Sequence, residues 1–147
     1  MIEAIKQLRE ETGAAIGEIR SALKESGGDP RRARELLREK LGAIAVRKSD
    51  RETRSGLVDA YVHANGKIGA MVEMHCETDF VARPGEFREL AHSIAMHIAA
   101  MDPRDAEELS GQEYVRDPER RVRDVVQEAA GKFGENIKIG NFIRFAL

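Results

Sequence analysis

The residues best suited to chemistry lie together near the middle of the chain. Their types could form a thiol nucleophile with its base, or a metal site. His75 and Cys76 are adjacent, and Glu73, Glu77 and Asp79 share one strand parity. Adjacent side chains of a strand point to opposite faces, so His75 cannot activate Cys76, and we interpret the cysteine as a small buried hydrophobe. The acidic row could bind a metal or act as a general acid, but a solvated sheet face explains it better.

Other candidate groups give equally little support to catalysis. His92 and His97 lie five residues apart on one predicted helix, which rotates them away from a shared metal ion, so we interpret both as ordinary helix positions. The glycines of 131–134 stand at a predicted helix end and not in a phosphate-binding loop. The arginines between 31 and 38 could contact RNA, although a charged outer helix face explains them about as well. We therefore predict no enzyme activity, no metal site and no cofactor.

Composition indicates a soluble protein with one modest core and a small satellite domain. The chain has 147 residues, 41% of them hydrophobic and 34% charged, and no run approaches the roughly 18 apolar residues of a membrane-spanning helix. Its start lacks the pattern of a signal peptide, so we expect a cytoplasmic protein that does not contact membranes. Residues 1–54 carry 13 Lys and Arg against 10 Asp and Glu, an excess too weak for nucleic acid to be the main partner.

The first third of the chain has helical periodicity. Apolar residues recur at helical spacing in three segments, which Thr12-Gly13 and Gly27-Gly28 separate. Asp29-Pro30 supplies a capping side chain and a proline suited to the first position of the third helix. The predicted division of the chain is a helical domain at 1–50, a polar linker at 51–56 and a core domain at 57–147.

After the linker the period changes from helical to two. The stretches 58–62 and 68–76 predict a hairpin, and residues 137–147 predict a third strand with a bulge at Gly140-Asn141. A three-residue loop at 64–66 would pair Val62 with Ile68 and keep the apolar residues on one face.

Two helices complete the predicted core. One runs from Phe87 to Met101 and ends at Asp102-Pro103, and the other opens at Asp117-Pro118 and stops at Gly134. The polar residues 103–116 between them predict a loop. The expected fold class is α+β, with three N-terminal helices followed by a three-stranded antiparallel sheet that helices cover on one face.

Phe80 stands where the second strand ends, and a phenylalanine at such a position ordinarily belongs to the core. Three motifs favour a different role. The segments Leu8–Ala14, Cys76–Arg83 and Gly134–Ile137 resemble, in this order, the hallmark motifs of the elongation factor Ts family. The resemblance covers nearly the whole chain, and it implies a ubiquitin-associated-like fold for the N-terminal domain.

The resemblance also implies a function. Members of the family are guanine nucleotide exchange factors for elongation factor Tu, which they bind in its GDP-bound and nucleotide-free states, and they break no covalent bond. By resemblance, Thr78, Asp79, Phe80 and Val81 would disturb the partner's Mg²⁺ and phosphate site, with the Phe80 ring acting as a wedge. The alternative from the residues alone is a helical binding module with an RNA- or protein-binding role and no exchange activity.

The N-terminal domain and the core length carry further implications of the resemblance. The residues implied to bind the partner are Leu8, Arg9, Thr12, Gly13, Ile16 and Gly17, and the last of these replaces a methionine usual in the family. The chain has a single core half where longer members have two, and a shortened 103–116 region. It therefore resembles compact members that form homodimers, and we expect a homodimer with no direct nucleic-acid contact.

Overall fold

The computed structural model describes all 147 residues as an α+β protein. It has seven helices and five strands, in the chain order α1 (Ile2–Thr12), α2 (Ile16–Glu25), α3 (Pro30–Lys48), β1 (Ser55–Val62), β2 (Ile68–Cys76), α4 (Asp79–Ala82), α5 (Gly85–Met101), α6 (Ala106–Gly111), β3 (Glu113–Tyr114), β4 (Asp117–Arg121), α7 (Val122–Phe133) and β5 (Lys138–Ala146). Each helix is too short or too polar to reach across a membrane.

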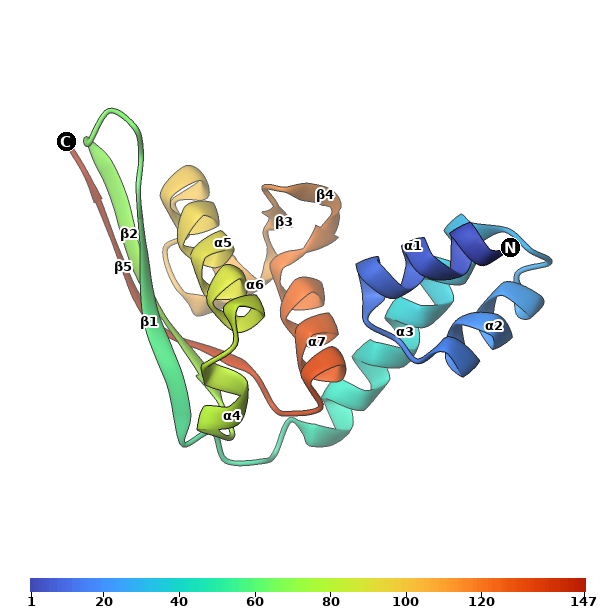
Figure 1. Cartoon of the computed structure of the whole chain (residues 1–147). Coiled ribbons are helices and arrows are strands. Elements are labelled where there is room, and N and C mark those ends of the chain that lie inside the picture. Colours follow the sequence, from blue (N-terminus) through green and yellow to red (C-terminus); the bar gives the residue numbers. More distant parts are fainter.

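The elements form layers that run from an antiparallel sheet to the N-terminal helices (Figure 1). The sheet has the strand order β1-β2-β5, and β3 pairs with β4 in a separate small sheet. Helix α5 packs on one face of the large sheet, α7 lies behind α5, and α1 to α3 lie beyond α7. The predicted α+β class, with helices on one face of a three-stranded sheet, is confirmed.

The three predicted N-terminal helices are present, and each ends or begins where its sequence signals place it. Gly13 ends α1 with a φ of 67°, a left-handed conformation that favours glycine. The Asp29 carboxylate accepts the Arg31 N–H at 2.9 Å, and Pro30 occupies the first turn of α3. Leu8, Ile19 and Leu37 are fully buried in the small core that these helices enclose.

Helix α3 belongs to both parts of the molecule. Its second half crosses α7 so closely that a Cβ on Gly131 would lie 2.5 Å from the Leu41 carbonyl oxygen. Ala45, one turn further on, is buried in the main core. The predicted linker at 51–56 is too long, because Ser55 and Gly56 already pair with β2 as the first residues of β1.

The hairpin register differs by one residue from the expected one. Val62 pairs with Gly69 and not with Ile68, and His63 donates its N–H to the Ile68 carbonyl at 2.8 Å. The side chains of β1 are therefore inverted, so that Tyr61 faces α5 while Val58 and Val62 face outward. An edge-to-face contact between the Tyr61 and His92 rings, 5.8 Å apart, holds this inverted face to α5.

The predicted bulge in the third strand is confirmed. Val72 pairs with Phe142, whereas Met74 pairs with Ile139, which leaves one extra residue in β5 between them. The extra residue reverses the parity of the strand, so Ile139 and Phe142 pack on the core while Phe145 is 66% exposed.

Two expectations for residues 103–121 are wrong. Helix α6 and strand β3 occupy the predicted loop, and Asp117 begins strand β4, so the last helix starts only at Val122. The buried His97 imidazole explains the extra structure, because it donates from Nε2 to Gln112 at 2.9 Å and accepts the Val115 N–H at Nδ1. Burial lowers the pKa of His97 and keeps the ring neutral in this arrangement.

Candidate functional site

The turn that follows β2 separates two apolar neighbours. Helix α4 is a single turn that begins after Thr78, and successive residues of a helix point about 100° apart. Val81 therefore packs into the core, while the Phe80 side chain is 87% exposed, more than any other aromatic residue in the chain. A fully solvated ring on a short turn gives the molecule an apolar projection beside the sheet.

The segment after α7 fastens this turn. Glu135 accepts the Glu77 and Thr78 N–H groups at Oε1, both at 3.1 Å, and the Thr78 hydroxyl at Oε2, at 2.6 Å. In return, the Glu77 carboxylate accepts the Asn136 N–H at 2.7 Å. The second and third sequence motifs thus form one hydrogen-bonded unit.

The same segment is tied to the end of α3. The buried Asn136 amide donates to the Ser49 and Arg51 carbonyls at 3.2 and 2.7 Å, and Lys48 donates to the Gly134 carbonyl at 2.8 Å. Gly134, with a φ of 72°, lets the chain leave α7 in the direction that these bonds require. The turn that carries Phe80 therefore rests on a junction of three chain segments.

The reactive side chains near this turn have structural partners. The Ser55 hydroxyl donates to Asp79, and the buried Cys76 thiol donates to the Thr78 carbonyl at 3.3 Å. Burial raises the pKa of Cys76, so the thiol stays protonated at neutral pH. His75 points to the other sheet face, where its hydrogen bond to Glu73 lowers the pKa of that carboxyl group.

The six N-terminal residues implied to bind a partner divide into two groups. Leu8 and Thr12 are buried, and the Thr12 hydroxyl donates to the Leu8 carbonyl at 2.6 Å, so neither side chain reaches the surface. Arg9, Gly13, Ile16 and Gly17 are exposed. The loop that these residues flank joins α1 to α2 and lies next to α7 (Figure 1).

Gly13, one of the exposed residues of this set, links the N-terminal helices to the core. A Cβ at this position would lie 2.6 Å from the Lys132 side chain, which crosses above it from α7. Lys132 also forms an ion pair with Glu86 of α5 at 3.4 Å. The loop after α1 is therefore positioned by side chains of both α5 and α7.

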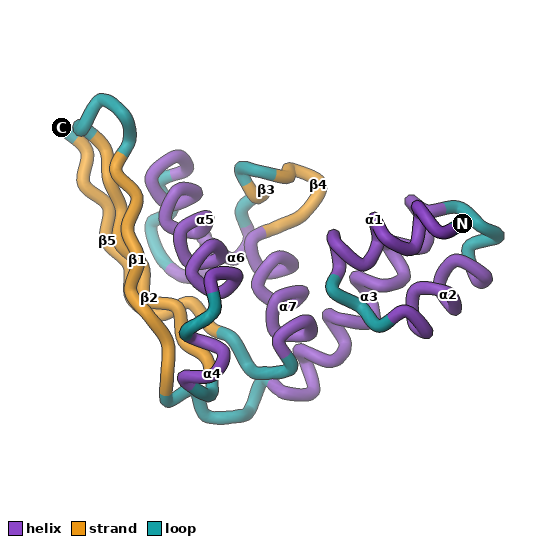
Figure 2. The backbone as a smooth tube through the Cα atoms, in the orientation of Figure 1, coloured by secondary structure: helices purple, strands orange, loops and turns teal.

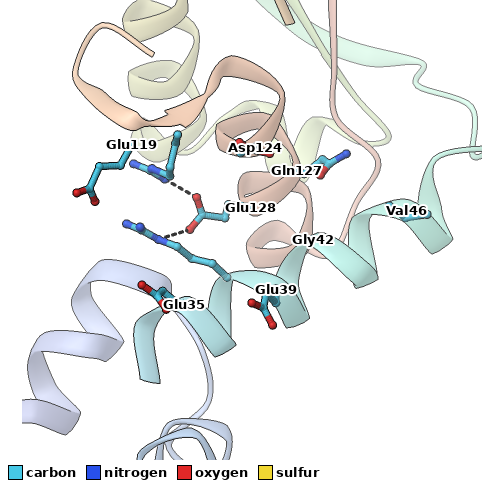
Figure 3. Close-up of a pocket in the computed structure, with 10 residues that line it drawn as sticks. Glu35, Glu39, Gly42, Val46, Glu119, Asp124, Gln127 and Glu128 are labelled. Atoms are coloured by element: carbon cyan, nitrogen blue, oxygen red, sulfur yellow. Dashed lines mark hydrogen bonds and ion pairs between the residues drawn. The ribbon is translucent and has the colours of Figure 1, made fainter. Parts of the chain in front are cut away.

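A charged groove between α3 and α7 takes up Arg38, one of the four arginines at 31–38 (Figure 3). Glu128 lies at its centre and receives Arg38 of α3 at 3.1 Å as well as Arg120 of β4. Arg34 pairs with Glu11 of α1 in the same way. Arg34 and Arg38 therefore hold helices together, whereas Arg31 and Arg32 are exposed and pair with Glu119 and Glu35.

Sequence reasoning did not identify Glu135, Asn136, Glu128 or His97 as organising residues. Glu135 and Asn136 belonged to a motif used only for the resemblance, although two polar residues directly after a helix-stop glycine are a signal of capping or tertiary contacts. Nothing local marks Glu128, because its partners come from two distant segments.

The fold and the site define an α+β protein with an exposed aromatic ring on a turn beside its sheet, and no group of His, Cys, Asp and Glu side chains is placed to hold a metal ion. The family model described as elongation factor TS matches residues 3–108 and 77–147. This chain belongs to the elongation factor Ts family.

Individual relatives agree with the family model over nearly their full length. The chain is 39% identical to the elongation factor Ts of Rubrobacter xylanophilus over 191 aligned positions, which cover 99% of this chain and 98% of the relative. It is 37% identical to the elongation factor Ts of Thermotoga petrophila, with coverage of 99% and 95%. An alignment of 191 positions exceeds this chain's 147 residues, so the Rubrobacter protein has residues without a counterpart here.

Proposed function

We propose that this chain is a guanine nucleotide exchange factor that binds GDP-bound elongation factor Tu and speeds the release of GDP. Membership of the elongation factor Ts family supports this function. The observation that carries the proposal is Phe80, an aromatic ring that is 87% exposed on a turn fastened by Glu135. The factor acts by binding and forms no covalent intermediate.

Exchange by binding requires that factor and nucleotide weaken each other's affinity for the same partner. A factor that binds the nucleotide-free GTPase more tightly than the filled one lowers the affinity for GDP by the same ratio. The Mg²⁺ ion is the vulnerable point, because it bridges phosphates and protein and tolerates little change in its octahedral geometry. Thr78, Asp79, Phe80 and Val81 form the segment that disturbs this site.

Phe80 supplies part of the free energy for that disturbance. Its ring is solvated in the free factor, so nearly all of its apolar surface becomes buried when it enters a gap between partner side chains. About 100 Å² of ring surface at about 25 cal/mol per Å² contributes roughly 2–3 kcal/mol. Val81 anchors the turn in the core, and the Asp79 carboxylate accepts a hydrogen bond from the Ser55 hydroxyl.

The N-terminal helices make the second contact with the partner through the exposed side chains of Arg9 and Ile16 and the open surface at Gly17. Leu8 and Thr12 shape the loop from inside, and Gly13 ends α1 beneath the Lys132 side chain. This domain, 1–50, and the core that begins at β1 are held to each other by the Arg38–Glu128 ion pair and the close crossing of α3 and α7.

The uncovered face of the sheet is the proposed homodimer interface. No helix lies on this face (Figure 2), and its outward side chains include five that are large, apolar and exposed: Val58, Val62, Met71, Ile143 and Phe145. In a two-fold sheet-to-sheet contact, these five residues of one protomer can pack against the same five residues of its partner. The factor then acts in the cytoplasm as a dimer that binds two partner molecules, without direct contact with nucleic acid or membrane.

The deciding experiment follows fluorescent GDP as it leaves elongation factor Tu while the concentration of this protein is increased. We expect the release rate to rise and to saturate, and the Phe80→Ala variant to reach a much lower plateau. Met101→Ala, which shortens an exposed side chain at the end of α5, is the matched control and should keep the full rate. Binding to elongation factor Tu with no acceleration of release would refute the proposal and favour a helical binding module.

A further inference from the structure

We propose that Glu135 is the positioning residue of the exchange turn, because its carboxylate sets the direction in which Phe80 projects. This inference rests on the proposed function, which gives the exposed ring its task. Glu135 is 57 residues from Thr78 along the chain and belongs to the segment between α7 and β5. Its contribution is to the geometry of the turn and not to a contact with the nucleotide.

The hydrogen bonds of Glu135 fix the orientation of the chain just before α4. One carboxylate oxygen accepts two successive backbone N–H groups, those of Glu77 and Thr78, and the other accepts the Thr78 hydroxyl. Three donors that converge on one planar group define the plane of the peptide between them. Rotation of that peptide would turn α4, and with it the Phe80 ring.

At Thr78, the long-range hydrogen bond to Glu135 replaces the local capping bond that a threonine at this position commonly makes. Thr78 is the N-cap residue of α4, where a threonine hydroxyl commonly accepts an N–H of the first helical turn. Here the Thr78 side chain makes no capping bond, and its hydroxyl donates to Glu135 instead. The turn thus lacks a local side-chain cap, and Glu135 provides the side-chain contact at its start.

Glu135 is itself held on a fixed base. The carbonyl of its neighbour Gly134 accepts a hydrogen bond from Lys48 at the end of α3. The side-chain amide of its other neighbour, Asn136, donates to the carbonyls of Ser49 and Arg51. The other anchors of the turn are Val81, the one buried residue of α4, and the hydrogen bond from Ser55 to Asp79. A single helical turn is unstable alone, so its direction follows from these anchors, of which Glu135 alone fixes the peptide that enters it.

The expected consequence is a slower step after binding and little change in affinity. Without the Glu135 carboxylate, α4 would pivot about Val81, and only some of the bound complexes would place the ring in the partner's gap. The half-saturating concentration should change by less than about twofold, because the N-terminal contact is unaffected. The maximal release rate should fall about tenfold in Glu135→Ala, equal to about 1.4 kcal/mol.

The test compares Glu135→Ala, Glu135→Gln and Glu107→Ala in the full chain, in the fluorescent GDP assay at saturating factor. Glutamine should restore most of the rate, because its carbonyl oxygen can accept both N–H groups and its amide can donate to the Thr78 hydroxyl. Glu107 lies on α6, is exposed and makes no hydrogen bond or ion pair, so its truncation should leave the rate unchanged. A full rate in Glu135→Ala, or a loss in Glu135→Gln as large as in Glu135→Ala, would overturn the proposal.

A double-mutant cycle separates positioning from general destabilisation. If Glu135 acts through the ring, Glu135→Ala should lower the maximal rate of the wild type but cause no further loss in Phe80→Ala. Independent losses that multiply would overturn the proposal. If circular dichroism shows that Glu135→Ala does not fold, Thr78→Val takes its place in the cycle with the same expected pattern, and additivity there is equally decisive.

The cycle also distinguishes this inference from the proposed function. A normal rate in Phe80→Ala would refute the wedge and therefore the task assigned to the turn. A slow Phe80→Ala together with a normal, folded Glu135→Ala would leave the exchange function intact and refute only the positioning role.

Discussion

Phe80 and Val81 are neighbours on one turn with opposite surroundings, so truncating each to alanine separates partner contact from folding. The Phe80 ring is 87% exposed, and its removal takes almost nothing from the folded free protein. We expect the free energy of unfolding of Phe80→Ala to stay within about 0.5 kcal/mol of the wild type. The stimulated release of GDP should instead slow by about 30- to 150-fold, which corresponds to the roughly 2–3 kcal/mol of lost ring burial.

Val81→Ala should mainly lower the stability of the folded protein and affect GDP release less. Val81 is buried in the main core, and loss of two methyl groups there leaves a cavity under the turn. We expect the free energy of unfolding to fall by about 1–3 kcal/mol and the melting temperature by roughly 3–10 °C. At a temperature where the variant remains folded, the exchange rate should fall less than in Phe80→Ala, since the ring is still present.

The two measurements are thermal unfolding of the free factor and GDP release at saturating factor. We expect the ranking of the two variants to reverse between the two assays. If Phe80→Ala lowered the melting temperature as much as Val81→Ala while exchange stayed normal, the ring would belong to the fold and not to the partner.

Three further predictions follow from the same structure. Phe145→Asp, on the uncovered sheet face, should convert the proposed dimer to a monomer in analytical ultracentrifugation, and a wild type that is itself a monomer, or a variant that stays dimeric, would refute this interface. Gly131→Ala should lower the free energy of unfolding by about 1–3 kcal/mol in denaturant titration, because its Cβ would collide with the Leu41 carbonyl, whereas Gly111→Ala has open space and should cause no loss. The pKa of His97 is lowered by burial, so the unfolded chain binds a proton more readily; stability should be complete above about pH 6.5 and fall as the pH drops below it. His97→Gln should reduce this acid sensitivity in melting temperatures measured from pH 7 to pH 5, and an equal slope in both proteins would contradict the assignment.

Much of the fold could be predicted from the sequence because it depends on local signals. Asp29-Pro30 and Gly134 mark helix ends through capping geometry, and the three strands follow from alternation. The small β3–β4 sheet could not be predicted in this way. It depends on the contact of the His97 imidazole with Gln112 and Val115, which no local pattern reveals.

The candidate site could be located from the sequence, but its construction could not. The motif around Phe80 indicated the turn, and the exposure of the ring is consistent with a partner contact. The dependence of that turn on Glu135 and Asn136 involves hydrogen bonds between residues almost sixty positions apart. Of the predicted N-terminal contacts, Leu8 and Thr12 proved to be buried, because a motif identifies the residues of a loop without showing which of them face outward.

The register of the hairpin shows how a small error in sequence reasoning conceals a surface. Pairing Val62 with Ile68 would place Val58, Ala60 and Val62 on the core and turn Leu57 and Tyr61 outward. The actual pairing with Gly69 turns Val58 and Val62 outward, and the bulge in β5 turns Ile143 and Phe145 to the same side. Two independent one-residue shifts thus gather apolar side chains on the one sheet face that no helix covers. Because soluble monomers rarely expose such a face, the same shifts that contradict the expected core provide the strongest structural support for the proposed dimer.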